Sequence, residues 1–241
     1  MENGPSVCFQ PRAEQKDRRV TTKNTAGAPS FQLYLALTCR SISTFVCLIK
    51  SKRKKTMSTH MIPDLTLEKI TLDRLDDFYD ALNESGKEWF AAGMIPKPDF
   101  SREEAGQMLK GFVALWDQDN TYMFFILDAQ SKDILGVVFL NRIDRTHQLA
   151  NLGYVVRTSR TRRGVATEAA RLVAEYGFEK LGLQRIEIVV SKDNIPSLKV
   201  AEKLHAVREG LLRNRILLHG IPTDAYLHSV IPFDFGIHKP G

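Results

Sequence analysis

The chain has 241 residues, a net formal charge of +6 and three cysteines, a length that suits one domain with a substantial core or two small ones. Residues 1–60 hold eleven Lys or Arg and three acidic residues, so this segment carries +8 and the remainder −2. The basic balance therefore gives no reason to assign nucleic-acid binding to residues 61–241. Cys8, Cys39 and Cys47 also lie in the first segment, which excludes a disulfide framework, a thiolate metal site and a cysteine nucleophile from the rest.

The first sixty residues differ in composition from residues 61–241. Residues 1–30 are polar, and such a composition cannot bury enough apolar surface to offset chain entropy. Residues 31–49 are more apolar, but Arg40 lies near their middle and the run barely reaches the ~20 residues that a membrane span needs. We predict that residues 1–60 form a basic extension, disordered or not native, with no stable membrane span. A targeting or peripheral-membrane segment and a part of the fold are the alternatives.

Regular patterns begin near residue 64. Leucines in alternation predict a first strand, and an apolar stripe with Asp73 as its cap predicts a first helix. Ser101 followed by Glu104 forms a capping box for a second helix. Two apolar runs then flank a short polar turn, which predicts a hairpin. The expected elements are a strand at 65–71, helices at 74–85 and 102–118, and strands at 121–129 and 134–144.

The second half alternates strands and helices. Apolar runs and helical stripes predict strands at 150–156 and 184–191, helices at 167–181 and 195–204, and final strands at 206–220 and 225–232. Gly182 ends the first of these helices. The resulting order, β-α-α-β-β-β-α-β-α-β-β, predicts one α/β (α+β) domain over residues 61–241, with a central sheet and helices on its faces.

One segment has the pattern of a phosphate-binding turn. Residues 157–167 read RTSRTRRGVAT and lie between a strand and a helix. Backbone N–H groups at a helix start lack intrahelical partners, and the helix dipole favours an anion there. Gly164 allows the main chain to approach a ligand closely. Arg162 and Arg163 add positive charge, so the turn predicts a site for a cofactor that carries a pyrophosphate.

These features resemble the GNAT superfamily of acetyl-CoA-dependent N-acetyltransferases, and within it the RimJ/RimL type that acetylates the N-termini of ribosomal proteins. The likeness covers about residues 64 to 234. The acyl-CoA signature of the family (Gln or Arg, two residues, Gly, one residue, Gly or Ala) falls on residues 161–166, where Thr161 departs from the expected first residue. A second marker falls on Asn194 and Ser197, followed by AEKLHAVREG. The resemblance implies the GNAT fold, a mixed and mostly antiparallel central sheet with helices on both faces.

The resemblance also implies which residues hold acetyl-CoA. Backbone amides of the turn would bind the pyrophosphate, namely those of Arg162, Arg163, Gly164, Val165, Ala166 and Thr167. The preceding strand would splay from its neighbour and offer Tyr154, Val155 and Val156 to the acetyl-pantetheine arm, with the Val156 N–H polarising the thioester carbonyl. Asn194 would bind the same arm. An ordinary helix cap for Thr167 and a turn residue for Asn194 are the alternatives.

Acetyl transfer to an amine needs a neutral amine, donors for the oxyanion and a proton for the leaving thiolate. Many relatives supply that proton from a Tyr, but Ala201 occupies its position here. Ser197, one helical turn earlier, is implied as the acid; a hydroxyl that bonds its own backbone is the alternative. Glu187, on the opposite strand face from Ile186 and Ile188, is the predicted base. A solvated acid paired with Lys or Arg, or a water chain acting as base, remains open.

Other signals exclude competing chemistry or set the surroundings of the site. The histidines at 147, 205, 219 and 228 show no metal-ligand spacing, so no metal is expected. No P-loop lysine follows Gly164, which argues against nucleotide triphosphate chemistry. The turn also lacks the glycine triplet of the Rossmann dinucleotide-binding motif. The aromatic residues Trp89, Phe90 and Phe100 flank a loop that borders the acceptor cleft in this family; plain core packing is the alternative.

We therefore predict a cytoplasmic acetyl-CoA-dependent N-acetyltransferase that works by direct attack in a ternary complex, since residues 61–241 offer no cysteine for an acetyl-enzyme. The acceptor is an amine, and a protein N-terminal α-amine follows from family analogy alone. A small-molecule amine acetyltransferase and a non-catalytic acetyl-CoA sensor are the alternatives. The partners considered are an amine acceptor and a homodimer, with no nucleic acid on the folded domain.

Overall fold

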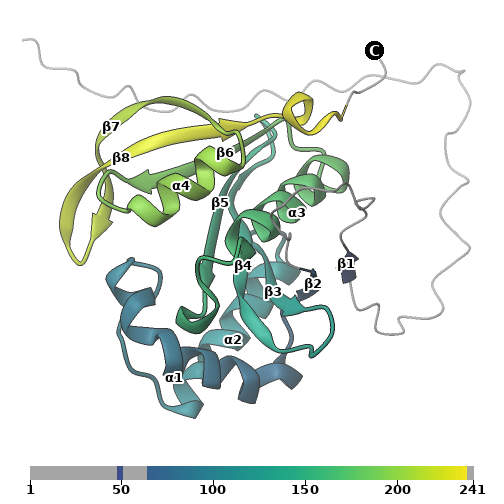
Figure 1. Cartoon of the computed structure of the whole chain (residues 1–241), viewed down its shortest axis with the longest axis vertical. Coiled ribbons are helices and arrows are strands. Elements are labelled where there is room, and N and C mark those ends of the chain that lie inside the picture. Colours follow the sequence, from purple (N-terminus) through teal and green to yellow (C-terminus); the bar gives the residue numbers. More distant parts are fainter. Residues whose placement is uncertain (1–47, 51–63, 238–241) are drawn as a thin grey trace, which may run out of the picture. The chain divides into compact units, whose positions relative to one another are not determined.

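An eight-stranded sheet is the centre of the structure (Figure 1). The computed structural model describes residues 48–50 and 64–237. The strands are β1 Leu48–Lys50, β2 Leu65–Lys69, β3 Tyr122–Asp128, β4 Ile134–Asp144, β5 Leu149–Val156, β6 Arg185–Ser191, β7 Val207–Leu218 and β8 Ile221–Val230. Their order across the sheet is β1-β2-β3-β4-β5-β6-β8-β7. Every neighbouring pair is antiparallel except β5 and β6, which are parallel.

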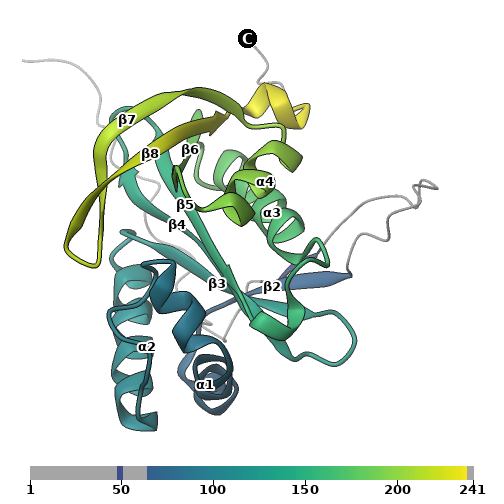
Figure 2. The same cartoon turned by 60° about the vertical axis from the view of Figure 1, so that its left-hand side comes forward.

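Helices cover both faces of this sheet. They are α1 Leu75–Ala91, α2 Arg102–Asp117, α3 Val165–Glu179 and α4 Ile195–Lys203. Figure 2 shows α1 and α2 on one side of the sheet and α3 and α4 on the other. The predicted α/β arrangement, a mixed and mostly antiparallel sheet between helices, is thereby confirmed.

Side-chain alternation along β3 divides the core into two halves. Phe124 and Ile126 pack in the cluster that contains α3, whereas Phe125 and Leu127 pack in the cluster that contains α1 and α2. All four side chains are buried. A strand covered on both faces is apolar at every position, which is why residues 122–127 form an uninterrupted hydrophobic run.

The predicted elements are present, and several of their ends differ. The capping box of α2 is confirmed, since Ser101 Oγ accepts from the Glu104 N–H (3.2 Å) and Glu104 Oε2 accepts from the Ser101 N–H (2.8 Å). The assignment of Asp73 as the cap of the first helix is wrong, because Asp73 lies inside a short 3-10 turn and α1 starts after Arg74 without a side-chain cap.

Helix α1 also runs six residues beyond its predicted end at Ser85, to Ala91. Gly86 lies within it because the following loop crosses there: a Cβ at this position would be 2.1 Å from the Pro98 carbonyl oxygen. The glycine therefore permits a close crossing and does not end the helix. The extra turn carries α1 toward the end of the sheet where β5 and β6 separate.

Part of the predicted N-terminal extension has regular structure. Strand β1 pairs with β2 at the edge of the sheet, with Ile49 opposite Leu67. Apart from residues 48–50, the segment covered by the prediction for residues 1–60 lies outside the described residues. No helix in the described ranges, 48–50 and 64–237, is long and apolar enough to cross a membrane.

Candidate functional site

The parallel strands β5 and β6 meet at one end only. Residues Leu149 to Asn151 pair with Arg185 to Glu187, and the register ends there. Strand β5 continues to Val156 and β6 to Ser191 without a partner on the facing side. The two strands therefore enclose a V-shaped opening in the sheet, at the position where the resemblance implies a splay.

Backbone groups of β5 face this opening. The Arg157 N–H donates to the Leu135 carbonyl (2.8 Å), so the next opposed pair, Gly136 and Val156, is not hydrogen-bonded in the alternating antiparallel ladder. By the same alternation, the backbone N–H and carbonyl of Tyr154 do not form hydrogen bonds with β4. The N–H groups of Tyr154 and Val156 consequently point away from β4 and into the opening, where they can donate to a ligand.

The facing edge of β6 is open in the same way. The Lys192 N–H donates to the Asp224 carbonyl (3.2 Å), which places even-numbered positions of β6 in the ladder with β8. Val189 and Ser191 therefore present their backbone groups to β5. A linear ligand with amide groups can add to both edges, as a strand would.

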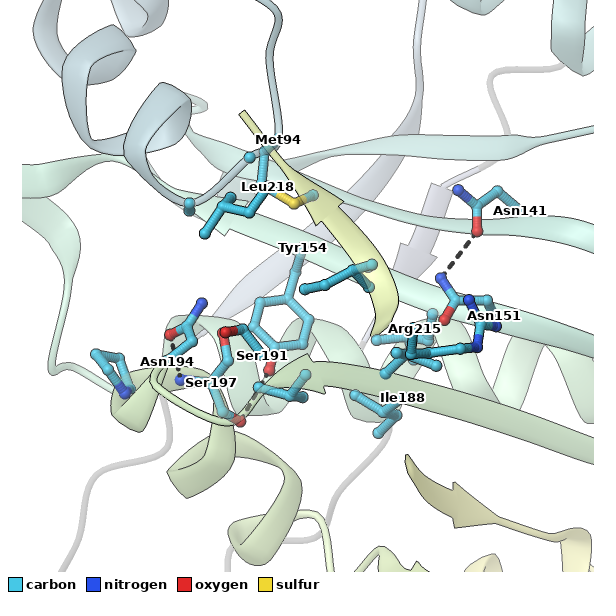
Figure 3. A pocket seen from close by; sticks show the side chains of 18 of the residues that line it. Met94, Asn141, Asn151, Tyr154, Ile188, Ser191, Asn194, Ser197, Arg215 and Leu218 are labelled. Atoms are coloured by element: carbon cyan, nitrogen blue, oxygen red, sulfur yellow. Dashed lines mark hydrogen bonds between the residues drawn. The ribbon is translucent and has the colours of Figure 1, made fainter. Parts of the chain in front are cut away.

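A cleft of about 970 Å³ occupies this opening and extends beyond it. Its walls come from the end of α1, from β4, β5 and β6, from the start of α4 and from β7. Figure 3 shows Tyr154, Asn194 and Ser197 at one end of the cleft, with Asn151 and Arg215 at the other and Met94 and Leu218 along one side.

The start of α4 brings the predicted Asn194 and Ser197 together. Asn194 is the N-cap, and its Oδ1 accepts from the Ser197 N–H (3.1 Å). This contact fixes the amide group and leaves its Nδ2 free to donate into the cleft. The Ser197 carbonyl accepts from the Tyr154 hydroxyl (3.3 Å). Burial raises the pKa of Tyr154 to about 12, so its phenol stays protonated and acts as a donor.

The Ser197 hydroxyl has no partner among the hydrogen bonds of the described residues. The cap of α4 is made by Asn194, so the alternative in which the serine hydroxyl satisfies its own backbone finds no support. Ser197 lines the cleft with a hydroxyl that is available to a ligand. This arrangement fits the proton donor that the sequence predicts.

The predicted phosphate turn lies directly beyond β5. Gly164 has a left-handed conformation (φ 82°) and α3 starts at Val165, two residues before the predicted start at Thr167. Thr167 is therefore in the first helical turn and is not the cap. Within residues 64–237, no acceptor bonds the backbone N–H groups of residues 162–167. Six unpartnered amides at a helix N-terminus fit a pyrophosphate.

Side chains around the turn supply positive charge. Arg162 and Arg163 are exposed and belong to none of the ion pairs found in the described part of the chain. Arg160 pairs with Asp133 (3.6 Å), and the Thr161 hydroxyl bonds the Thr158 carbonyl (2.9 Å). The residue that replaces the usual Gln or Arg is thus used within the turn, and Arg162 and Arg163 remain for an anion.

Side chains of helix α1 form hydrogen bonds with the start of the turn. Ser85 Oγ accepts from the Thr158 N–H (2.9 Å), and the Glu84 carboxylate accepts from the Ser159 N–H (3.0 Å) and from Arg157 Nε (2.8 Å). Burial alone would raise the pKa of the Glu84 carboxyl, but the bonds from Ser159 and Arg157 outweigh it and hold the pKa below its usual range.

Trp89 lies one helical turn further along α1 and is buried, which agrees with plain core packing. Its Nε1 also donates to the Val156 carbonyl (3.1 Å). This bond fixes the strand position whose amide faces the opening. The loop after α1 borders the cleft as the resemblance implied, since residues 91–94 line it.

Glu187 lies where the sequence placed it but is not brought into the site. It forms an ion pair with Arg185 (3.1 Å between Nε and Oε1), and Arg185 also binds Glu209. Glu187 does not line the cleft. The geometry favours the alternative of a paired sheet-face acid, and the role of general base stays a prediction. In the described residues, no cluster of His, Cys, Asp and Glu could hold a metal ion.

The cleft contains side chains that the sequence did not single out. Asn141 and Asn151 are opposed on β4 and β5, and their side chains are hydrogen-bonded (2.9 Å). Arg142 and Arg215 line the same end. Both arginines lie in strand irregularities, between Asn141 and Asp144 and between Leu212 and Ile216, that a period-two pattern does not reveal.

The comparisons with known proteins decide the family. The model of the acetyltransferase (GNAT) domain matches residues 64–207 of this chain. The chain belongs to the GNAT acetyltransferase family. This GNAT protein is therefore an acyltransferase that uses acetyl-CoA to acetylate an amine, as the sequence predicts.

Two relatives and one solved structure illustrate the likeness. The GNAT domain is 31% identical over 131 residues to the uncharacterized N-acetyltransferase YoaA of Bacillus subtilis (strain 168), which is 54% of this chain and 74% of that protein. It is 31% identical over 102 residues to spermidine N(1)-acetyltransferase of Escherichia coli (strain K12), 42% of this chain and 54% of that protein. The structure of Mycobacterium smegmatis RimJ in complex with CoA-disulfide has the same fold, with a TM-score of 0.65, 21% identity, and coverage of 72% of this chain and 84% of that one.

Proposed function

We propose that this GNAT protein transfers the acetyl group of acetyl-CoA to the N-terminal α-amine of a polypeptide, by direct attack in a ternary complex. The observation that carries the cofactor assignment is the row of six unpartnered amides at residues 162–167, continuous with the open edge of β5. The amides of the turn hold the pyrophosphate, and the V-shaped opening takes the pantetheine arm with its two amide groups.

The reaction follows from the groups at the start of α4. The neutral amine attacks the thioester carbonyl carbon, and the developing oxyanion accepts from the Val156 N–H. The Tyr154 N–H, about 7 Å further along the strand, faces the same opening. When the carbon–sulfur bond breaks, the Ser197 hydroxyl donates its proton to the sulfur. The proton lost by the amine restores the serine, directly or through water. The Asn194 Nδ2 donates to the pantetheine arm.

A polypeptide acceptor is supported by exposed apolar side chains at the rim of the cleft. Met94 and Leu217 line the cleft and are exposed, with 37% and 69% of their surfaces accessible. Exposed apolar side chains at the rim of a cleft suit contact with another chain. The homodimer and the cytoplasmic location predicted from the sequence stay predictions.

Transfer is tested by incubating the purified protein with acetyl-CoA and peptides that begin with a free serine or alanine. We expect release of CoA thiol together with a peptide that has gained one acetyl group, both seen in the same reaction. In a panel that includes free amino acids and spermidine, acetylation of those small amines with no peptide product would contradict the proposal.

The cofactor site is tested by Gly164→Asp, which adds bulk and negative charge to the amide turn. Acetyl-CoA affinity measured by calorimetry should fall by about a hundredfold or more, since an unfavourable conformation and charge repulsion act together. Gly182→Asp is the matched control, because Gly182 has a similar left-handed conformation (φ 70°) and open space around it. An equal loss in both variants would reject the turn as the site.

A further inference from the structure

Two arginines line the acceptor end of the cleft, whereas Asp224, which binds the neighbouring Asn214 N–H, lies outside the lining. The charged residues that line the cleft are Arg142, Arg215 and Asp193. Neither arginine belongs to an ion pair in the part of the chain that the structure describes. Arg157 and Arg185, by contrast, each pair with a glutamate. Unpaired guanidinium groups in a cleft are ready to bind carboxylates.

The arginines lie far from the pyrophosphate turn. Arg142 follows Asn141, which is opposite Asn151 on β5, and Figure 3 shows Arg215 and Asn151 at the same end of the cleft. Five residues separate Asn151 from Val156, or about 17 Å of extended strand. The two arginines therefore address a charge on the acceptor and not the diphosphate of acetyl-CoA.

The rise per residue along β5 also gives the distance between the reacting amine and an acceptor charge bound by the two arginines. Tyr154, whose amide faces the opening, is three residues from Asn151, or about 10 Å along the strand. The carboxylate of a free amino acid is too close to its own amine to extend over this length. Two or three residues of an extended peptide cover it, at about 3.3 Å each.

Among the described residues, Asp193 is the one acid in the cleft lining, and it belongs to the other end. It precedes Asn194, the cap of α4, and so lies beside the residues assigned to the cofactor. A polyamine would find two arginines and no carboxylate at the acceptor end, and like charges repel there. The charge of this lining therefore disfavours a polycation as the acceptor.

We infer that the preferred acceptor is a polypeptide N-terminus with acidic residues at its second to fourth positions, held by Arg142 and Arg215. This inference rests on the proposed function and deepens it, since it names the chemical class of the acceptor. The free α-amine lies near Ser197 and Tyr154, and the acidic side chains extend along β4 and β7. Met94 and Leu217 contact the aliphatic parts of the peptide at the rim.

The test uses three peptides with the same N-terminal serine and a C-terminal fluorescein, in which positions two to four are all Asp, all Asn or all Lys. Binding to the full-length protein saturated with CoA is measured by fluorescence anisotropy, and acetyl transfer is measured in parallel. We expect the Asp peptide to bind about tenfold or more tighter than the Asn peptide, and the Lys peptide to bind more weakly than both.

Charge-reversal variants assign the effect to the two arginines. Arg142→Glu and Arg215→Glu should each weaken binding of the Asp peptide about tenfold and strengthen binding of the Lys peptide. Acetyl-CoA affinity should stay unchanged, which also shows that the variants are folded. Arg213→Glu is the matched control, because Arg213 is exposed on the same strand and does not line the cleft.

The outcomes separate this inference from the proposed function. Equal binding of the three peptides, or an equal effect of Arg213→Glu, would overturn the acidic preference even if all three peptides are acetylated. Acidic preference in binding without acetyl transfer would support the inference about the cleft and reject the proposed reaction.

Discussion

At the scale of single residues, Ser197 is fixed through its backbone and free at its hydroxyl. Its N–H is bound by Asn194 and its carbonyl by Tyr154, while the hydroxyl faces the cleft. A substitution at Ser197 therefore removes the hydroxyl and leaves the contacts that hold α4 in place. This separation makes Ser197 a sharp test of the proton donor.

Ser197→Ala should lower kcat for acetyl transfer by about a hundredfold, the usual contribution of a positioned acid, and leave the affinity for acetyl-CoA within about twofold. The measurement is steady-state kinetics together with calorimetry. Ser131→Ala, in the β3–β4 turn, controls for loss of a hydroxyl elsewhere. If kcat is unchanged in Ser197→Ala, water protonates the thiolate and the serine has no acid role.

Residue spacing predicted part of this site. Asn194 and Ser197 were predicted from the second marker of the family resemblance, and both line the cleft in the structure. Arg142 could not be predicted in the same way, because its positive φ of 52° interrupts the alternation of β4. A side chain directed by a local irregularity has no signature in a period-two pattern.

At the scale of elements, α1 joins the two halves of the site. Its middle holds the pyrophosphate turn through Glu84 and Ser85, Trp89 holds Val156, and the loop after the helix lines the acceptor side. One rigid helix therefore sets the distance between the bound cofactor and the acceptor. We infer that residues of α1 with no ligand contact affect both binding steps.

Glu84→Ala tests this coupling. Loss of the carboxylate releases Arg157 and the Ser159 amide, so the turn loses its support and acetyl-CoA affinity should fall about tenfold. Hydrogen exchange should become faster at residues 157–160, a change that a mere loss of surface charge would not cause. Glu88→Ala, exposed on the same helix and outside the ion pairs of the described residues, is the control. Unchanged affinity in Glu84→Ala would show that the turn does not depend on the Glu84 contacts.

The boundaries of the elements show why the sequence pattern did not predict the full length of α1. The sequence pattern predicted each strand and α-helix from β2 to β8 but not the short 3-10 helices at Leu72–Arg74 and Thr158–Arg160, and the resemblance implied the splay. The last turn of α1 was missed because Gly86 and the polar residues near it resemble a helix end. The glycine is required there by the close approach of the Pro98 backbone, and a tertiary approach of this kind is not visible in local sequence.

At the scale of the molecule, the site is distributed between Glu84 on α1 and Leu218 on β7, and no strand before β4 contributes to the cleft. Strand β1 lies at the far edge of the sheet, separated from β5 by three other strands. The edge at β1 is therefore remote from the cleft, although core residues lie on both sides of β4.

Two truncations separate these contributions. Deletion of residues 1–47 retains β1, and deletion of residues 1–56 removes it. Both proteins should bind acetyl-CoA and acetylate peptides as the full chain does, because the turn and the cleft are untouched. The longer deletion also removes the pairing of Leu48–Lys50 with β2 and exposes that edge. Each lost hydrogen bond contributes about 1 kcal/mol, so we expect a Tm lower by several degrees and some self-association at the bare edge. Thermal unfolding and light scattering of the two proteins side by side measure this difference. A shorter deletion that already loses acetyl transfer would show that residues 1–47 take part in the function.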